Sequence, residues 1–222
     1  MSDKDSKMKL VGAIAVAAIL VLAVLIVASQ SGGGDDGSEV ATGDLLDGIP
    51  QNGTVLGEPD APLTLVEFGD MQCPHCRDFS QEVMPEIIEG PVRDGEVKVS
   101  FLNWVVIDQR SALAAAASLA AAEQGYYWQY LDTFFAEPGR EVSEENLRAV
   151  AEEAGVPDLD QWEDDLDDPR WDGELARIGR EAQQLGFGGT PSFAYRAAGS
   201  RELIPIDPPG SAADVESLAA GG

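Results

Sequence analysis

Two cysteines separated by two residues are the most chemically distinctive feature of this chain. Cys73 and Cys76 are the only cysteines among its 222 residues. They follow an apolar run, Leu63 to Phe68, that is typical of a buried strand. A C-x-x-C pair between a strand and a helix is the signature of a thiol-disulfide centre. The sequence therefore predicts that these two thiols form and break a disulfide.

The spacing predicts a different role for each thiol. If Cys73 opens a helix, its sulfur is exposed at the helix N-terminus, where free backbone N–H groups and the helix dipole favour an anion. Cys73 is then the attacking thiolate. Cys76 lies one turn further along the helix and resolves the mixed disulfide by internal attack.

The two intervening residues favour the thiolate form of Cys73. Pro74 falls in the first helical turn, where its missing N–H costs nothing, and His75 adds a polar or cationic group near the sulfur. Each unit by which the pKa falls is worth about 1.4 kcal/mol, or roughly 30 mV in a two-electron couple. Because this energy stabilises the reduced form, the sequence predicts an oxidising couple.

Other chemistries of a C-x-x-C pair fit these residues less well. A zinc site needs further ligands, and the only histidine, His75, lies between the two cysteines. Two inert buried thiols would gain no packing advantage from the flanking Pro and His. A copper-handling or chaperone-like module that uses the thiols as soft ligands is a further alternative. No cofactor motif is present.

The segment Cys73-Pro74-His75-Cys76 resembles the active site of the DsbA family of thioredoxin-fold disulfide oxidoreductases. Four further stretches, together spanning about residues 54 to 195, agree with that resemblance. They are the strand before the motif (Leu65 to Phe68), a Gly-Thr-Pro loop (Gly189 to Phe193), an aromatic-rich helical block (Ala114 to Phe135) and the lead-in to the first core strand (Val55 to Pro62).

The resemblance implies a thioredoxin-like α/β fold with an inserted helical domain, whereas composition and periodicity alone support only α/β. It also implies that the Thr190–Pro191 bond is cis and that this loop lies beside the disulfide; by itself the pair indicates an ordinary trans turn. Glu67, six residues before Cys73, corresponds to a buried acid that handles protons for the second cysteine. The alternative is an outward-facing strand residue.

The activity implied by the resemblance is oxidation of thiols in exported client proteins. A quinone-linked membrane partner is implied as the reoxidant, since the chain has no other cysteine to pass electrons internally. The main alternative is a disulfide reductase or isomerase on the same fold.

The N-terminal segment predicts a membrane anchor. Residues 1–9 form a short tail, and residues 10–28 contain no charge and at about 1.5 Å per residue reach nearly 30 Å, enough to cross a bilayer core. A cleavable signal is the alternative, but its apolar region usually has about 7 to 15 residues. Three lysines precede the span and two aspartates follow it, which predicts a cytoplasmic N-terminus and an extracytoplasmic domain: Lys4, Lys7, Lys9, Asp35 and Asp36.

The remaining chain divides into a linker and one domain. Residues 29–51 are rich in Gly, Ser and Asp and predict a flexible tether. Residues 52–220 predict the thioredoxin-like domain, with its helical insertion at about 108–186. Beyond the span, 38 acidic and 11 basic residues remain. Such a surface repels nucleic acid, so no nucleic-acid partner is expected. The acidity is interpreted either as an ordinary solvated surface or as a functional feature, namely adaptation to a salty exterior or steering of basic clients.

Periodicity places the elements around the motif. The helix after Cys73 should kink or restart at Pro85, and a strand at 97–106 should pair in parallel with Leu63 to Phe68. An acidic turn is expected at 163–168. The remaining predicted elements are helices at 111–124, 127–135, 143–154 and 171–185, strands at 192–196 and 201–204, and a short helix at 211–219.

Overall fold

A mixed sheet in the strand order β1-β2-β4-β3-β5-β6 forms the centre of the computed structural model, which describes residues 45–221. Strands β3 and β4 are parallel, from Leu63 opposite Val97 to Gly69 opposite Asn103, as predicted. Strands β2 and β5 flank this pair antiparallel. The strands are β1 (Gln51–Asn52), β2 (Val55–Leu56), β3 (Leu63–Gly69), β4 (Val97–Asn103), β5 (Ser192–Ala197) and β6 (Ile204–Ile206).

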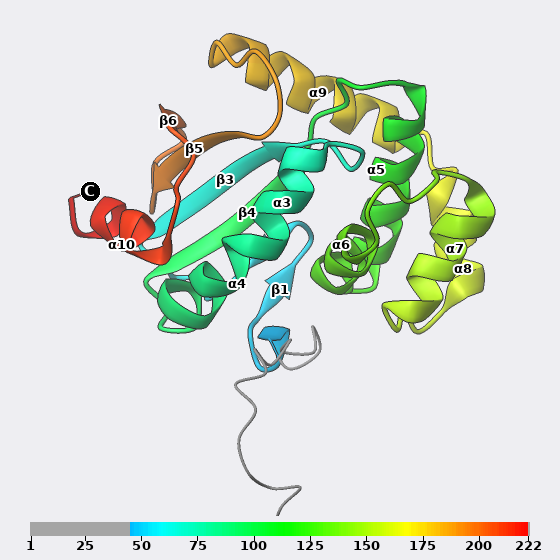
Figure 1. Cartoon of the computed structure of the whole chain (residues 1–222), viewed down its shortest axis with the longest axis horizontal. Helices are drawn as coiled ribbons and strands as arrows, with labels where there is room; N and C mark the ends of the chain where they lie inside the picture. The colour runs from blue at the N-terminus through cyan, green and yellow to red at the C-terminus, as the bar shows by residue number, and fades with distance from the viewer. Residues whose placement is uncertain (1–44, 222) are drawn as a thin grey trace, which may run out of the picture. The chain divides into compact units, whose positions relative to one another are not determined.

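The connection from β3 to β4 begins with the helix that bears the cysteines. It comprises α3 (Pro74–Glu82), α4 (Met84–Ile87) and a π-helical turn, η1 (Ile88–Val92). The helix is interrupted at Val83, as predicted from Pro85, because a proline has no N–H to continue the helical hydrogen bonds. In Figure 1, α3 and α4 lie across one face of β3 and β4.

Five helices separate β4 from β5, so the thioredoxin-like core carries the predicted helical insertion. They are α5 (Gln109–Glu123), α6 (Tyr127–Ala136), α7 (Glu144–Glu153), α8 (Leu159–Leu166) and α9 (Arg170–Gln184). Helix α9 packs Ile178 and Ala182 against Val66 and Phe68, on the sheet face away from the main core. Strand β3 is therefore buried on both faces, which explains why most of its residues are apolar. Helix α10 (Ala212–Gly221) ends the described chain.

Three predicted elements differ from the structure. The expected acidic turn at 163–168 overlaps α8, which begins because the Asp158 carboxylate accepts a bond from the Gln161 N–H (2.9 Å) and which buries Trp162. Strand β4 ends at Asn103 instead of 106. The N–H groups of Val106 and Ile107 donate to the Asp70 carboxylate instead of to a neighbouring strand. The last strand is Ile204–Ile206 and not 201–204.

The domain begins earlier than residue 52. Leu45 and Leu46 are buried, although the predicted linker includes them. The Arg93 guanidinium fixes this segment by donating to the carbonyl oxygens of Leu45 (2.7 Å) and Asp47 (3.1 Å). Within residues 45–221, no helix is both long and apolar enough to span a membrane. The predicted tail and membrane span, residues 1–28, lie outside the described residues.

Candidate active site

Cys73 is the N-cap of α3, as the motif predicts. Its Sγ accepts a bond from the Cys76 N–H (3.4 Å), and its thiol donates to the Thr190 carbonyl oxygen (3.3 Å). The residue is only 5% exposed, so the expectation of an exposed sulfur is wrong. The loop before β5 lies directly against the thiol, and the sulfur is reached from a cavity that Cys73 helps to line.

The surroundings of Cys73 favour its thiolate. A hydrogen bond from the Cys76 thiol is the largest effect, and together with a bond from the Thr190 side chain and bonds from the backbone N–H groups of Cys76 and His75 it lowers the pKa of Cys73 to about 5, against burial. A cysteine with the ordinary pKa of 9.0 is protonated at pH 7, whereas Cys73 is ionised.

Cys76 has the opposite character. It is fully buried in the main core, and burial raises its pKa far above that of an ordinary thiol. Its hydrogen bond to Cys73 acts in the same direction, as does the charge of Glu67 whenever that carboxyl is ionised. Two adjacent thiols thus differ strongly in acidity, so that one is an anion and the other keeps its proton at neutral pH.

Glu67 lies on β3 beside the two cysteines. It is 2% exposed, so the alternative of an outward-facing residue is wrong. Burial, followed by the charge of Cys73, raises the pKa of Glu67 well above its usual range, and a hydrogen bond with Cys76 opposes the shift. Its Oε1 has no protein partner. A buried carboxyl without a cation favours the protonated form.

The structure brings Pro191 and His75 close to the thiols in different ways. The Thr190–Pro191 bond is cis, and the Thr190 carbonyl contacts Cys73. Pro74 is the first residue of α3. The His75 side chain is 78% exposed, and its Nδ1 lies 3.8 Å from the Asp78 carboxylate. His75 therefore acts on the Cys73 pKa through its backbone N–H.

Asp70, which the sequence analysis did not single out, fixes the loop that precedes Cys73. Its buried carboxylate accepts bonds from the N–H groups of Gln72 (2.9 Å), Val106 (2.9 Å) and Ile107 (3.1 Å). Its carbonyl accepts from the Cys73 N–H (2.9 Å). One acidic side chain thus joins the cysteine loop to the loop after β4. A polar residue directly after a buried strand is the sequence signal that could have identified it.

A buried polar cluster of Asn103, Ser118 and Tyr127 lies on the same sheet face as Glu67. The Asn103 Nδ2 donates to the Ser118 Oγ (3.2 Å) and to the Tyr127 hydroxyl (3.1 Å). The Ser118 and Tyr127 hydroxyls donate in turn to backbone carbonyls. The cluster ties the end of β4 to α5 and α6. Its members are far apart in sequence, and no motif predicts them.

The chain belongs to the thioredoxin family. The family model described as "Thioredoxin" matches residues 50–196, and the resemblance to DsbA-like disulfide oxidoreductases is confirmed by the relatives that follow. Within the thioredoxin family, this fold and cysteine pair therefore correspond to the disulfide oxidoreductases.

Individual relatives agree on that class. The chain is 32% identical over 144 residues to the probable disulfide bond formation protein D of Bacillus anthracis, and the match covers 62% of this chain and 66% of the relative, just under two thirds. It shares the fold of oxidised BdbD from Bacillus subtilis, with a TM-score of 0.64, 23% identity and coverage of 78% and 96% of the two chains. A thioredoxin-like oxidoreductase from Silicibacter pomeroyi has a TM-score of 0.61, 29% identity and coverage of 80% and 95%.

Proposed function

We propose that this chain is a thiol-disulfide oxidoreductase that introduces disulfides into exported proteins through its Cys73-Pro74-His75-Cys76 centre. The proposal rests on the position of Cys73 at the N-cap of α3, where its Sγ accepts a bond from the Cys76 N–H (3.4 Å). This position accompanies a Cys73 pKa lowered to about 5 beside a Cys76 pKa that is raised. The names of the relatives support the same activity. The N-terminal segment would hold the domain outside the cytoplasm as a single-pass membrane protein with a cytoplasmic N-terminus.

The exchange begins with the Cys73–Cys76 disulfide. A client thiolate attacks the Cys73 Sγ, forms a mixed disulfide and displaces the Cys76 sulfur with its electron pair. A thiol of high pKa is a poor leaving group, so Cys76 needs a proton as it departs. Glu67 is placed to supply it, because this carboxyl is buried beside Cys76 and favours its protonated form.

The second client thiolate attacks the client sulfur of the mixed disulfide and displaces Cys73. Because Cys73 is a stable thiolate, it leaves readily. The client loses two electrons and gains a disulfide, and the protein retains the two electrons as a thiolate and a thiol. An external oxidant must restore the protein disulfide, and we propose a quinone-linked membrane protein for this step.

The low Cys73 pKa also sets the direction of exchange. At pH 7 a thiol of ordinary pKa is protonated, whereas Cys73 is ionised. The reduced form is therefore stabilised only by the difference of about two between the solution pH of 7 and the Cys73 pKa of about 5. This difference corresponds to about 2.7 kcal/mol, or roughly 60 mV. The couple should therefore be more oxidising than that of an otherwise similar dithiol of ordinary pKa.

The reduction potential of the full-length protein, equilibrated with glutathione buffers at pH 7, tests this proposal. We expect a value well above the glutathione pool, and the potential should fall towards that of an ordinary dithiol in a variant that raises the Cys73 pKa. A potential near about −270 mV, as in thioredoxin, would instead identify a reductase.

A further inference from the structure

A cavity of about 560 Å³ opens beside the reactive sulfur. One wall is the N-terminal part of α3, with Cys73, Pro74 and Arg77, and the opposite wall is the end of α6 with the loop that follows it. Buried Phe134, Phe135 and Val142 contribute apolar surface. A cavity of this volume is in the range of ligand sites. It lies on the side of Cys73 formed by the helical insertion, and the Thr190–Pro191 loop does not line it.

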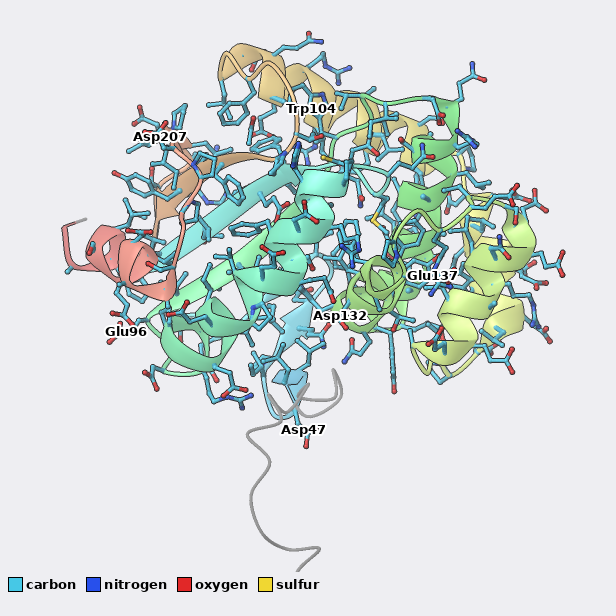
Figure 2. The ribbon with its side chains drawn as sticks, in the orientation of Figure 1. Asp47, Glu96, Trp104, Asp132, Glu137 and Asp207 are labelled. Carbon is cyan, nitrogen blue, oxygen red and sulfur yellow. The ribbon has the colours of Figure 1, made fainter. Side chains whose placement is uncertain are left out.

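The charged residues around the cavity are balanced, unlike those of the domain as a whole. Residues 45–221 contain 34 acidic and 11 basic residues, and Figure 2 shows carboxylate oxygens, in red, over much of the surface. Three arginines and three acids line the cavity; of the acids, Glu137 is labelled in Figure 2. An acidic segment that is repelled elsewhere meets much less repulsion here. The lining residues are Arg77, Arg110, Arg140, Asp78, Glu137 and Glu141.

Arg77 has hydrogen-bonding capacity to spare. Its Nε is buried and has no protein partner, and its one ion pair is a long contact of 3.4 Å with the adjacent Asp78. Arg110, by contrast, directs both Nε and an Nη at the Asp108 carboxylate. Arg140 also has a buried Nε without a protein partner, but it pairs with Glu137 and Glu153 and its side chain is only 12% exposed. A guanidinium has five N–H donors and binds a carboxylate well. Arg77 is 28% exposed, so a ligand reaches it.

We infer that this cavity receives the client segment next to the client cysteine, and that Arg77 selects an Asp or Glu side chain in that segment. The inference rests on the proposed function. Arg77 lies one helical turn after Cys73, since its N–H donates to the Cys73 carbonyl oxygen (3.1 Å), and both residues line the cavity. A client joined to the Cys73 sulfur therefore places residues one or two positions from its cysteine within reach of the guanidinium.

Two peptides that differ in one residue test this inference. Each has two cysteines and is otherwise neutral, and one has Glu where the other has Gln, two positions after the first cysteine. The full-length oxidised protein should oxidise the Glu peptide about fivefold faster at low salt, near the upper limit for a partly exposed ion pair. Because both peptides meet the same Cys73, the ratio of rates is independent of its reactivity. Salt at 1 M should reduce the ratio towards one.

Variants assign the preference to Arg77. Arg77→Gln should bring the ratio to about one, Arg77→Lys should retain part of it, and Arg201→Gln, which removes an equal charge from an exposed loop, should keep the fivefold preference. Equal rates for the two peptides with the wild-type protein, or an unchanged ratio in Arg77→Gln, would overturn the inference while oxidation of the Gln peptide still supports the proposed function. A protein that oxidises neither peptide contradicts both.

Discussion

Removal of the Cys76 thiol should change the acidity of Cys73 while leaving the helix N-terminus in place. The hydrogen bond from the Cys76 thiol is the largest of the effects that lower the Cys73 pKa from 9.0 to about 5. Cys76→Ala deletes this donor from a site that is fully buried. The bonds from the Thr190 side chain and from the backbone N–H groups of Cys76 and His75 remain.

The magnitude follows from the strength of a hydrogen bond to a charged group. Such bonds are worth about 1.5 to 3 kcal/mol, and one pKa unit corresponds to about 1.4 kcal/mol. The loss should therefore raise the Cys73 pKa by roughly one to two units. The variant thiol would titrate between about pH 6 and 7, still below an ordinary cysteine, because the remaining donors act on it.

The ultraviolet absorbance of the thiolate, followed against pH in the reduced protein, measures this change. The Cys76 pKa is raised well above the range of the titration, so a single step below pH 8 belongs to Cys73. Cys76→Ser is the matched control, since its hydroxyl retains a donor and should keep the midpoint nearer to the wild-type value. A Cys76→Ala midpoint that stays at about 5 would refute this reasoning and assign the shift to the backbone N–H groups instead.

Two further substitutions test the surroundings of the thiols. Burial raises the pKa of Glu67, so folding favours its protonated form. As the pH rises from 5 to 8, the free energy of unfolding of the oxidised wild-type protein should therefore fall relative to that of Glu67→Gln. Urea midpoints measure this difference, and a difference that stays constant with pH contradicts the prediction. A Cβ on Gly69 would lie 2.3 Å from the Phe101 ring and 3.2 Å from the Glu67 Oε1, so Gly69→Ala should cost about 1 to 3 kcal/mol. Gly173→Ala, where nothing lies within 4 Å, is the control and should not destabilise the protein.

The sequence predicted the core of the fold because its signals are local. The run from Leu63 to Phe68 has no polar residue facing solvent, and the parallel pairing with β4 follows from the helix between the two strands. The acidic segment of α8 misled the prediction because composition indicated a turn. The Asp158 cap and the buried Trp162, whose Nε1 donates to the Ala117 carbonyl (2.9 Å), outweigh that composition.

The site was predictable only where a motif marks it. Cys73 and Cys76 are recognisable from their spacing, but the sequence does not show that Thr190 covers one sulfur and the fold encloses the other. The position of Asp70 directly after a buried strand marks it as a candidate but does not show its partners in the loop after β4, and Asn103 gave no signal because its partners come from distant helices. Their roles depend on which chain segments the fold brings together, and no periodicity encodes that.

The carboxyl ends of β3 and β4 explain how one short motif holds two thiols of opposite acidity. Asp70, just beyond β3, fixes the loop from which α3 starts, so that backbone N–H groups meet the Cys73 sulfur. Glu67, three residues earlier, lies inside the core with Cys76. The two acids differ in one respect: Asp70 accepts three N–H bonds, whereas the Glu67 Oε1 accepts none. The bonds to Asp70 hold the loop in place, whereas burial raises the pKa of Glu67 and suits this carboxyl to hold a proton.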